Sequence, residues 1–451
     1  MTWPLRETSV TGNLDAMTTE PSRNTELEDV RAALERLDLP GWMRPLVGPS
    51  IKRSMDLLAK DLEPPRVAFY GRTGAGKSSV INALLGRLDA ATGEAAAVTM
   101  DATAYEFNRD GWKLEVIDSR GVGDHGGDRA YYEAIAQVIK HPPDVIVFVV
   151  PALERAYVDD DVQFLKALTG AHRRQHKTEL PVILAVSKID LVSPAEEWSP
   201  PYDLNISGLT RIPGADSSVQ PSPRARKETG IRAILRDRLE AYREVLFAGN
   251  EVGQVRVIPV CADWDDLRDR SYNVSVLAET MLECLPESAR EAFAGAIALK
   301  GVKAKASQDL ITRISLAAGG CALTPAGLDA FLVGCLIFAM VSVIARIGLG
   351  QDIDNKTPIA FLKRLGVFGP GPLVAMFIPL LKLFGIGFIM AAIAAPTVAV
   401  IVYAIGQAAV HHFIDGSSIE SAREVFENQK SEPGLKERLG KLLKRDSSRS
   451  A

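Results

Sequence analysis

The amino-acid sequence predicts an α/β protein with a mostly parallel sheet, and three observations carry that prediction. Short apolar runs such as VAFYG, KLEVID and DVIVFVV alternate with helix-length stretches between residues 66 and 260. Runs of this kind are typical of parallel strands buried on both faces. A glycine-rich turn, GRTGAGKS, joins the first run to a helical segment. The C-terminal part is helical in pattern and poor in charge, which predicts an additional apolar all-α domain.

The segment before the first strand predicts an N-terminal helical extension across residues 25–64. Residues 1–24 are polar without apolar periodicity, and we expect them to be disordered. Two stripes with the three- and four-residue spacing of a helix face follow, one of them formed by Leu27, Val30, Leu34 and Leu37. Proline-containing breaks at residues 40–41 and 64–65 end the two predicted helices.

Charge and cysteine content exclude several function classes. The 451 residues include 52 Lys and Arg against 56 Asp and Glu, a net charge of -4, so no global cationic field favours a nucleic-acid partner. The 4 cysteines are widely separated and lack metal-ligand spacing, which argues against a structural zinc site and a secreted disulfide framework. A reducing, cytosol-facing location is the expectation.

The turn after the first strand has the form G-x-x-x-x-G-K-[ST], between a strand and a helix as that motif requires. Glycines let backbone N–H groups wrap phosphates, the lysine reaches the β and γ oxygens, and the serine can ligate Mg²⁺. The predicted phosphate-binding residues are Gly71, Thr73, Gly74, Ala75, Gly76, Lys77, Ser78 and Ser79.

A second motif, about 110 residues downstream, predicts recognition of guanine and not adenine. Ser187-Lys188-Ile189-Asp190 ends a strand in the form of the [NT]KxD element. Asp190 would accept hydrogen bonds from N1 and N2 of guanine, and the Lys188 stem would pack over the base. Ser187 replaces the usual Asn or Thr, which weakens a loop-bracing contact. Cys261-Ala262 follows a later strand, where a backbone N–H can meet guanine O6.

The γ-phosphate and Mg²⁺ are expected to meet residues between these motifs. Asp118-Ser119-Arg120-Gly121 has the D-x-x-G form, with Asp118 holding Mg²⁺ through water and the Gly121 N–H sensing the γ-phosphate. Thr99 is the favoured threonine for Mg²⁺ and the γ-phosphate, because the competing Thr103 already belongs to a predicted strand. The predicted metal ligands are Ser78, Thr99 and Asp118, and the predicted catalytic groups are Lys77, Thr99 and Gly121.

Domain boundaries follow from these patterns. The nucleotide-binding domain is predicted over residues 65–290, with a proline-rich loop insertion at 192–227 and a polar helix from about residue 231 to 246. An apolar helical domain is predicted over 291–415. A basic amphipathic tail completes the chain at 416–451.

From about residue 39 to 293 the chain resembles the Era-like branch of the TrmE/Era/EngA GTPases, especially its YfjP/YeeP-like members. Four segments carry this resemblance: LPGWMRPLVGPSIKRSMDLLAKDLEPPRVAFYGRTGAGKSSVINALLG, DVIVFVVPALERAYVDDD, SKIDLV and LECLPESAREAF. The first of them contains the G-x-x-x-x-G-K-[ST] turn, or P-loop. It implies a Ras-like GTPase domain that binds GTP or GDP with Mg²⁺. Residues 294–415 look like the YcjF-type helical domain often fused to such GTPases.

Two departures from the family pattern affect the expected chemistry. Gly74 stands where several Era-like enzymes carry Asn, so potassium-dependent activation is not expected. Val122 stands where Ras-like proteins carry the glutamine that orients the attacking water, which suggests slow intrinsic turnover accelerated by a partner or by self-association. Arg120, Asp124 and His125 could contribute in cis, or could be polar simply because the loop is solvated.

Residues 326–412 contain only eight charged side chains, and two readings of them stay open. Residues 331–345 are uncharged but short for a membrane span, whereas the 28 uncharged residues 383–410 could cross about 30 Å of hydrocarbon. The favoured reading is membrane insertion or tight peripheral attachment, and the alternative is an internally packed bundle. The tail leucines could lie on an anionic membrane or belong to a solvated helix.

Together these patterns predict a GTP-binding, slowly hydrolysing switch, tethered at the cytoplasmic face of the inner (cell) membrane, with the cytoplasm as the alternative location. The nucleotide state would control an unknown protein effector or self-association. Alternative functions are a self-assembling membrane-remodelling GTPase and a soluble GTPase that assists assembly.

Overall fold

The computed structural model describes residues 64–86, 103–118, 127–204, 221–246, 256–265, 268–269, 271–321, 329–354, 356–367 and 391–449. The expected disordered segment 1–24 and the helical stripes within 25–64 lie outside these residues. So do Thr99 and Gly121.

A six-stranded sheet forms the centre of the first half of the described chain, with strand order β2-β3-β1-β4-β5-β6. Four neighbouring pairs are parallel and only β2 runs antiparallel to β3, so the predicted mostly parallel sheet is confirmed. The strands are β1 (Arg66–Tyr70), β2 (Thr103–Arg109), β3 (Trp112–Asp118), β4 (Val145–Pro151), β5 (Val182–Ser187) and β6 (Val257–Pro259). Thr103 lies in β2, as expected.

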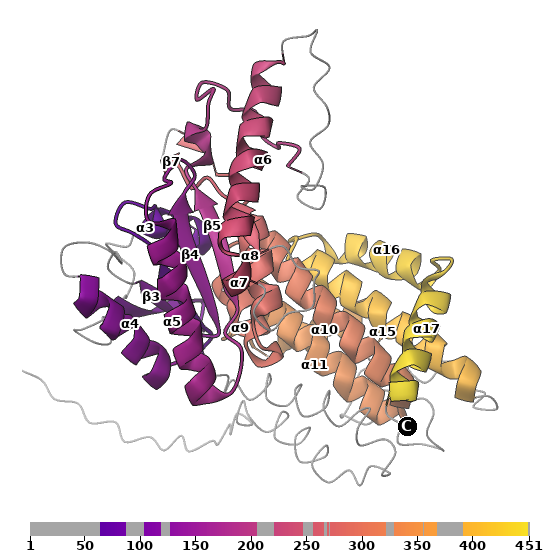
Figure 1. Ribbon diagram of the computed structural model, residues 1–451. Coiled ribbons are helices and arrows are strands. Elements are labelled where there is room, and N and C mark those ends of the chain that lie inside the picture. Colours follow the sequence, from indigo (N-terminus) through magenta and orange to yellow (C-terminus); the bar gives the residue numbers. More distant parts are fainter. Residues whose placement is uncertain are drawn as a thin grey trace, which may run out of the picture. The chain divides into compact units, whose positions relative to one another are not determined.

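Helices follow the strands in an alternating order. They are α3 (Lys77–Leu85), α4 (Gly127–Lys140), α5 (Val158–His176), α6 (Pro223–Ala241), α7 (Arg243–Leu246) and α8 (Val274–Cys284). Helices α4 and α5 pack on each other in front of the sheet (Figure 1). Buried aromatic rings join α5 to the sheet: Phe164 lies 5.6 Å from Tyr70 and 6.4 Å from Phe148 between ring centroids.

The polar helix of the insertion begins earlier than the sequence reading placed it. Helix α6 starts at Pro223, not near residue 231, so the prediction of loop structure up to residue 227 is wrong at its end. Ser222 is the N-cap, and its hydroxyl accepts a hydrogen bond from the Ala225 N–H at 3.2 Å. Proline at the first helical position costs no hydrogen bond, which explains why a helix can begin inside a proline-rich stretch.

The second half of the described chain is helical, as predicted. Its helices are α9 (Glu287–Ala296), α10 (Lys300–Cys321), α11 (Asp329–Leu349), α12 (Lys356–Leu365), α15 (Ala391–Phe413), α16 (Ile419–Lys430) and α17 (Leu435–Arg449). Helix α15 contacts α10, α11, α16 and α17, so it is surrounded by protein on several sides.

One described helix, over Ala395–Phe413, is long and apolar enough to cross a membrane by length and composition. Within the protein, 67% of its apolar window is buried against neighbouring helices, as in the core helix of a bundle. The leucine stripe of α17 is also used internally, because Leu435 and Leu439 are buried. Its exposed face carries Lys436 and Lys441.

Helix α9 connects the two halves. It contacts β2 and β3 of the sheet as well as α10 and α11 of the helical region. The turn between β2 and β3 also reaches the helical region, where the Gln351 N–H donates to the Asp110 carbonyl at 2.7 Å. The proposed domain boundary at residue 290 therefore passes through a helix that packs on both sides.

Candidate functional site

The P-loop leaves β1 in a backbone conformation that requires glycine. Gly71 has a φ of 144°, and a Cβ at this position would lie 2.3 Å from the Val149 carbonyl oxygen on β4. Gly76 has a φ of 93° immediately before α3 begins at Lys77. These conformations are strained for residues with a side chain, so the two glycines let the loop turn tightly onto the helix N-terminus. Backbone N–H groups at such a terminus form an anion site.

The Lys77 side chain folds back onto the main chain of the P-loop. Its side chain is buried, and Nζ donates hydrogen bonds to the carbonyls of Gly71 at 3.0 Å and Arg72 at 3.1 Å. A buried ammonium needs such partners because desolvation without them is costly. Around it, Thr73, Gly74, Ser78 and Ser79 are exposed, whereas Ala75 is buried. The structure therefore holds the cation beside exposed residues that the sequence predicts to bind phosphate.

Arg72 anchors the outer side of the P-loop to α5, a role that sequence reasoning missed. Its Nε donates to Asp161 Oδ1 at 3.1 Å, and its guanidinium lies 4.1 Å from the Tyr157 ring centroid. The Tyr242 hydroxyl donates to the other Asp161 oxygen at 3.3 Å. Burial raises the pKa of Asp161, and the Arg72 charge opposes that rise. The acidic first turn of α5, Asp159 to Asp161, is the sequence signal that could have suggested this contact.

Ser187 connects the P-loop to residues 187–190, the segment that the sequence predicts to recognise the base. Its hydroxyl lies 2.6 Å from the Ala75 carbonyl and 3.2 Å from the Val150 carbonyl, and it donates to these oxygens. A bracing contact to the P-loop main chain is therefore present with serine at this position, and the predicted weakening relative to Asn or Thr stays a prediction. This hydrogen bond fixes the carboxyl end of β5 against the phosphate loop.

Asp190 and Cys261, which the sequence predicts to lie at the guanine base, are in contact in the structure. Lys188 is exposed with a φ of 57°, and Asp190 follows in a short 3-10 turn, Ile189–Leu191. The buried Cys261 thiol donates to Asp190 Oδ1 with an Sγ to oxygen distance of 3.4 Å. Burial raises the pKa of Cys261 to about 12, so the sulfur keeps its proton at neutral pH. Ala262 follows, half-buried.

The predicted Mg²⁺ ligands are described only in part. Asp118 ends β3 opposite Phe69 of β1, the strand that leads into the P-loop, and Ser78 lies in the first turn of α3. Carboxylate and hydroxyl oxygens suit Mg²⁺, which usually takes one or two protein ligands together with phosphates and water. No group of three His, Cys, Asp or Glu side chains with metal-site geometry occurs among the described residues. Ser78 and Asp118 carry the oxygen ligand types that Mg²⁺ takes, and the nucleotide and water would supply its remaining ligands.

Comparison with known proteins finds GTPases among the similar sequences. Residues 66–188 match the family model described as "50S ribosome-binding GTPase". GTPase Der of Salinispora arenicola is 32% identical over 187 residues, which is 37% of this chain and 38% of that protein. GTPase Der of Streptococcus sanguinis is 35% identical over 132 residues, or 28% of this chain and 27% of that protein. The chain thus spans less than two fifths of the length of these relatives.

Structural comparison finds a probable GTP-binding protein EngB and a point variant of Aquifex aeolicus Era bound to GDP and tetrafluoroaluminate. The EngB structure is 18% identical, with a TM-score of 0.29 over 49% of this chain and 97% of that one. The Era structure is 16% identical, with a TM-score of 0.30 over 59% of this chain and 69% of that one.

Proposed function

We propose that this chain, whose residues 66–188 form a GTPase domain of the TrmE/Era/EngA type, binds GTP with Mg²⁺ and hydrolyses it slowly to GDP and phosphate. The observation that carries the proposal is the hydrogen bond between Ser187 and the Ala75 carbonyl, at 2.6 Å. It fixes the segment that would read guanine at a set position relative to the loop that would hold the phosphates. A nucleotide that pairs with Asp190 would then present its phosphates to Lys77.

Some residues of this chain would bind the phosphates and the base, and others would hold the Mg²⁺ that stabilises the phosphate charge. The P-loop N–H groups and Lys77 would bind the β and γ phosphates, and Asp190 would fix the base through two hydrogen bonds. Bound Mg²⁺ would neutralise charge on the phosphate oxygens, with Ser78 and Asp118 holding it. Since Val122 replaces the usual glutamine, water positioning would depend on another residue or on a partner, and turnover would be slow.

Competition binding tests the proposal directly. The full-length protein is titrated with a fluorescent GTP analogue, and unlabelled GTP, GDP and ATP are used as competitors with Mg²⁺ and with EDTA. We expect GTP and GDP to compete and ATP to compete at least about a hundredfold less well, because adenine cannot make the Asp190 hydrogen-bond pair. Phosphate release under excess GTP then measures hydrolysis. Equal competition by ATP would contradict the proposal.

We further propose that the domain acts as a switch attached to the cytoplasmic face of the cell membrane through residues 326–412. The charge-poor sequence supports this attachment, as does the likeness of residues 294–415 to YcjF-type domains. Flotation of the full-length protein with lipid vesicles, before and after a high-salt wash, tests it. Insertion of apolar segments resists salt, whereas purely electrostatic attachment is screened.

A specific observation favours the alternative of a soluble GTPase with an internally packed helical domain. Gln308 of α10 donates to the Tyr403 hydroxyl of α15 at 2.8 Å, and Gln407 of α15 donates back to Gln308. Arg438 of α17 lies 3.5 Å from the same Tyr403 oxygen. Tyr403 and Gln407 of α15 are thus paired with polar groups of neighbouring helices, as buried polar groups are in protein cores. Full-length protein that stays monomeric without detergent and does not float with vesicles would favour this alternative.

The switch proposal also states that the bound nucleotide controls either binding of an effector protein or self-association. Cross-linking of the full-length protein loaded with GDP or with a non-hydrolysable GTP analogue tests it. A nucleotide-dependent dimer would support self-association, and capture of a defined partner only in the GTP form would support an effector. A GTP-dependent shift into the large-ribosomal-subunit fraction would support the assembly-factor alternative.

A further inference from the structure

Lys227 is a charged residue in the core that the nucleotide motifs do not explain. It lies on α6, in the insertion that separates the predicted base motif from β6, and its relative exposure is 0%. Its Nζ donates hydrogen bonds to the Asp190 carbonyl at 2.8 Å and to the Pro194 carbonyl at 3.1 Å. It also lies 5.5 Å from the centroid of the Trp198 ring. The insertion therefore brings the buried Lys227 ammonium into contact with the main chain of Asp190, the residue proposed to bind guanine.

Burying this ammonium costs desolvation free energy, which suggests that the charge has a specific role. A lysine moved out of water without strong partners is destabilising, whereas an apolar side chain of similar size would fill the same space without that cost. Hydrogen bonds from a charged donor are stronger and geometrically tighter than those from a neutral one. Lys227 therefore restrains the Asp190 main chain more firmly than packing alone.

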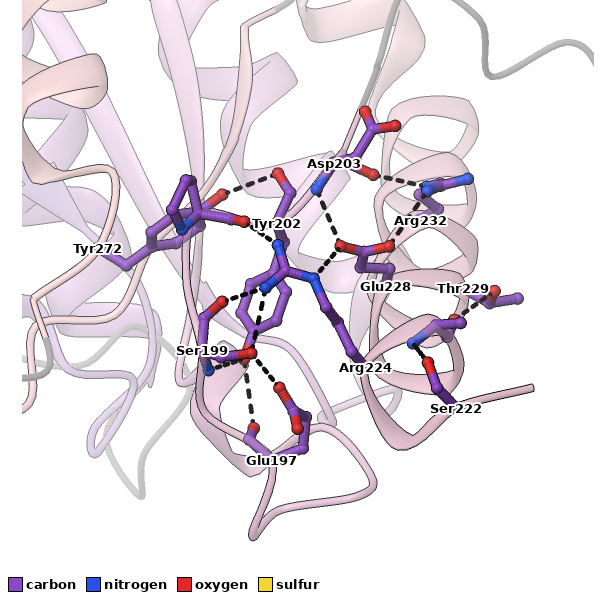
Figure 2. Close-up of polar contacts among 12 residues, drawn as sticks. Glu197, Ser199, Tyr202, Asp203, Ser222, Arg224, Glu228, Thr229, Arg232 and Tyr272 are labelled. Carbon is purple, nitrogen blue, oxygen red and sulfur yellow. Dashed lines mark hydrogen bonds and ion pairs between the residues drawn. The ribbon is translucent and has the colours of Figure 1, made fainter.

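The helix that carries Lys227 is itself fixed to the loop that follows Asp190. Arg224 donates to the Ser199 carbonyl at 2.7 Å, and Glu228 accepts from the Asp203 N–H at 3.1 Å (Figure 2). Arg232 donates to the Asp203 carbonyl at 2.9 Å. Contacts before and after Lys227 thus hold α6 and residues 197–204 as one unit.

A cluster of three aromatic rings links the same unit to Cys261. The rings of Trp198, Tyr202 and Tyr272 pack edge to face, with centroid distances of 5.9 Å, 6.3 Å and 5.9 Å. Tyr272 also pairs with Cys261 through two backbone hydrogen bonds, of 3.1 Å and 2.9 Å. Since Cys261 donates to the Asp190 carboxylate, both the main chain and the side chain of Asp190 are held by groups tied to this insertion.

From these contacts we infer that Lys227 is a positioning residue for guanine recognition: its ammonium holds the Asp190 main chain so that the carboxylate faces N1 and N2 of the base. The inference rests on the proposed GTP site and adds the insertion to it. In this role Lys227 would not contact the nucleotide. It acts through Asp190.

Inosine triphosphate supplies the readout, because it differs from GTP by the absence of the N2 amine that Asp190 would bind. The ratio of ITP to GTP dissociation constants measures how well the carboxylate is placed, and it does not depend on the fraction of folded protein. We expect Lys227→Met in the full-length protein to lower this ratio by about tenfold from the wild-type value. GTP affinity should fall more than ITP affinity.

Arg226→Met is the matched control, since it removes a positive charge from an exposed neighbouring position on the same helix. Its ratio and GTP affinity should equal those of the wild type. If Lys227→Met does not fold, Lys227→Gln gives the same comparison with a shorter, neutral donor. A folded Lys227 variant with the wild-type ratio would overturn the inference. Wild-type protein that does not distinguish GTP from ITP, or does not bind GTP, would instead contradict the proposed function.

Discussion

The Trp112 indole N–H donates a hydrogen bond of 3.0 Å to the Arg346 carbonyl, which lies 234 residues later in the chain. Trp112 begins β3, the strand that ends at Asp118, and Arg346 lies in the last turn of α11. Both residues are 2% exposed. The first residue of a strand that leads to the predicted metal ligand is therefore fixed by the helical region, which couples the stability of the two halves.

Gly295 of α9 gives the first prediction, because it packs on the Trp112 ring. A Cβ at Gly295 would lie 2.4 Å from the ring, so Gly295→Ala should force the contact apart. We expect the free energy of unfolding to fall by about 1–3 kcal/mol, as in other overpacked cores. Urea unfolding of the full-length protein measures the change.

The matched control is Gly301→Ala on α10, where the nearest atom would be Glu279 Oε1 at 3.6 Å. Alanine is the better helix former at such a position, so this variant should be neutral or more stable by up to about 1 kcal/mol. If both variants changed the unfolding free energy equally, the contact between Gly295 and Trp112 would not explain the loss.

Lys77→Ala is expected to abolish detectable hydrolysis and weaken GTP binding. The substitution removes the P-loop ammonium, and loss of a single well-placed charge-stabilising group commonly lowers kcat by about 10²–10³. Single-turnover phosphate release and a GTP titration measure the two effects. Lys113→Ala, on an exposed lysine of β3, is the control and should hydrolyse GTP as the wild type does. Wild-type turnover by Lys77→Ala would place the site elsewhere.

Cys261 predicts a dependence of stability on alkaline pH. Burial raises its pKa from the ordinary value of 9.0 to about 12, so the folded state disfavours the thiolate. The sign follows: the stabilising contribution is complete below about pH 9 and is lost as the pH rises towards 12. Relative to Cys261→Ser, the wild type should lose about 1 kcal/mol of unfolding free energy per pH unit above pH 9. Urea unfolding from about pH 7 to pH 10 measures this, and parallel curves for the two proteins would contradict it.

The sequence predicted the location of motifs that are built from neighbouring residues. The P-loop and the segment around Asp190 are local patterns at strand ends, and the structure joins them through Ser187. Other contacts join residues far apart in sequence: Lys227 lies 37 residues from Asp190, and Arg72 lies 89 residues from Asp161. No local spacing predicts such pairs, because they depend on which elements pack together.

Composition also could not decide the environment of α15. A helix rich in Val, Ile and Ala satisfies the same pattern in a lipid bilayer and in the core of a bundle. The structure shows that α15 contacts α10, α11, α16 and α17, and such contacts occur both in soluble bundles and in bundles within a membrane. For the same reason, the leucine stripe of α17 fitted a membrane surface in the sequence but packs against protein at Leu435 and Leu439.

Asp190→Asn is the sharpest test of the base assignment. The Asp190 carboxylate would present two acceptors to guanine N1 and N2, whereas an amide presents one acceptor and one donor, so the N2 amine would face an unsuitable group. Xanthine carries an oxygen at C2 in place of that amine, and the amide can donate to it. An unpaired buried polar group costs about 1–3 kcal/mol, so GTP affinity should fall by about ten- to a hundredfold while affinity for xanthosine triphosphate rises. Competition titrations of both proteins with GTP, ATP and xanthosine triphosphate measure this exchange. A mutant whose preference is unchanged would remove Asp190 from the base pocket, and a wild type that prefers ATP would exclude guanine as the base that this site reads.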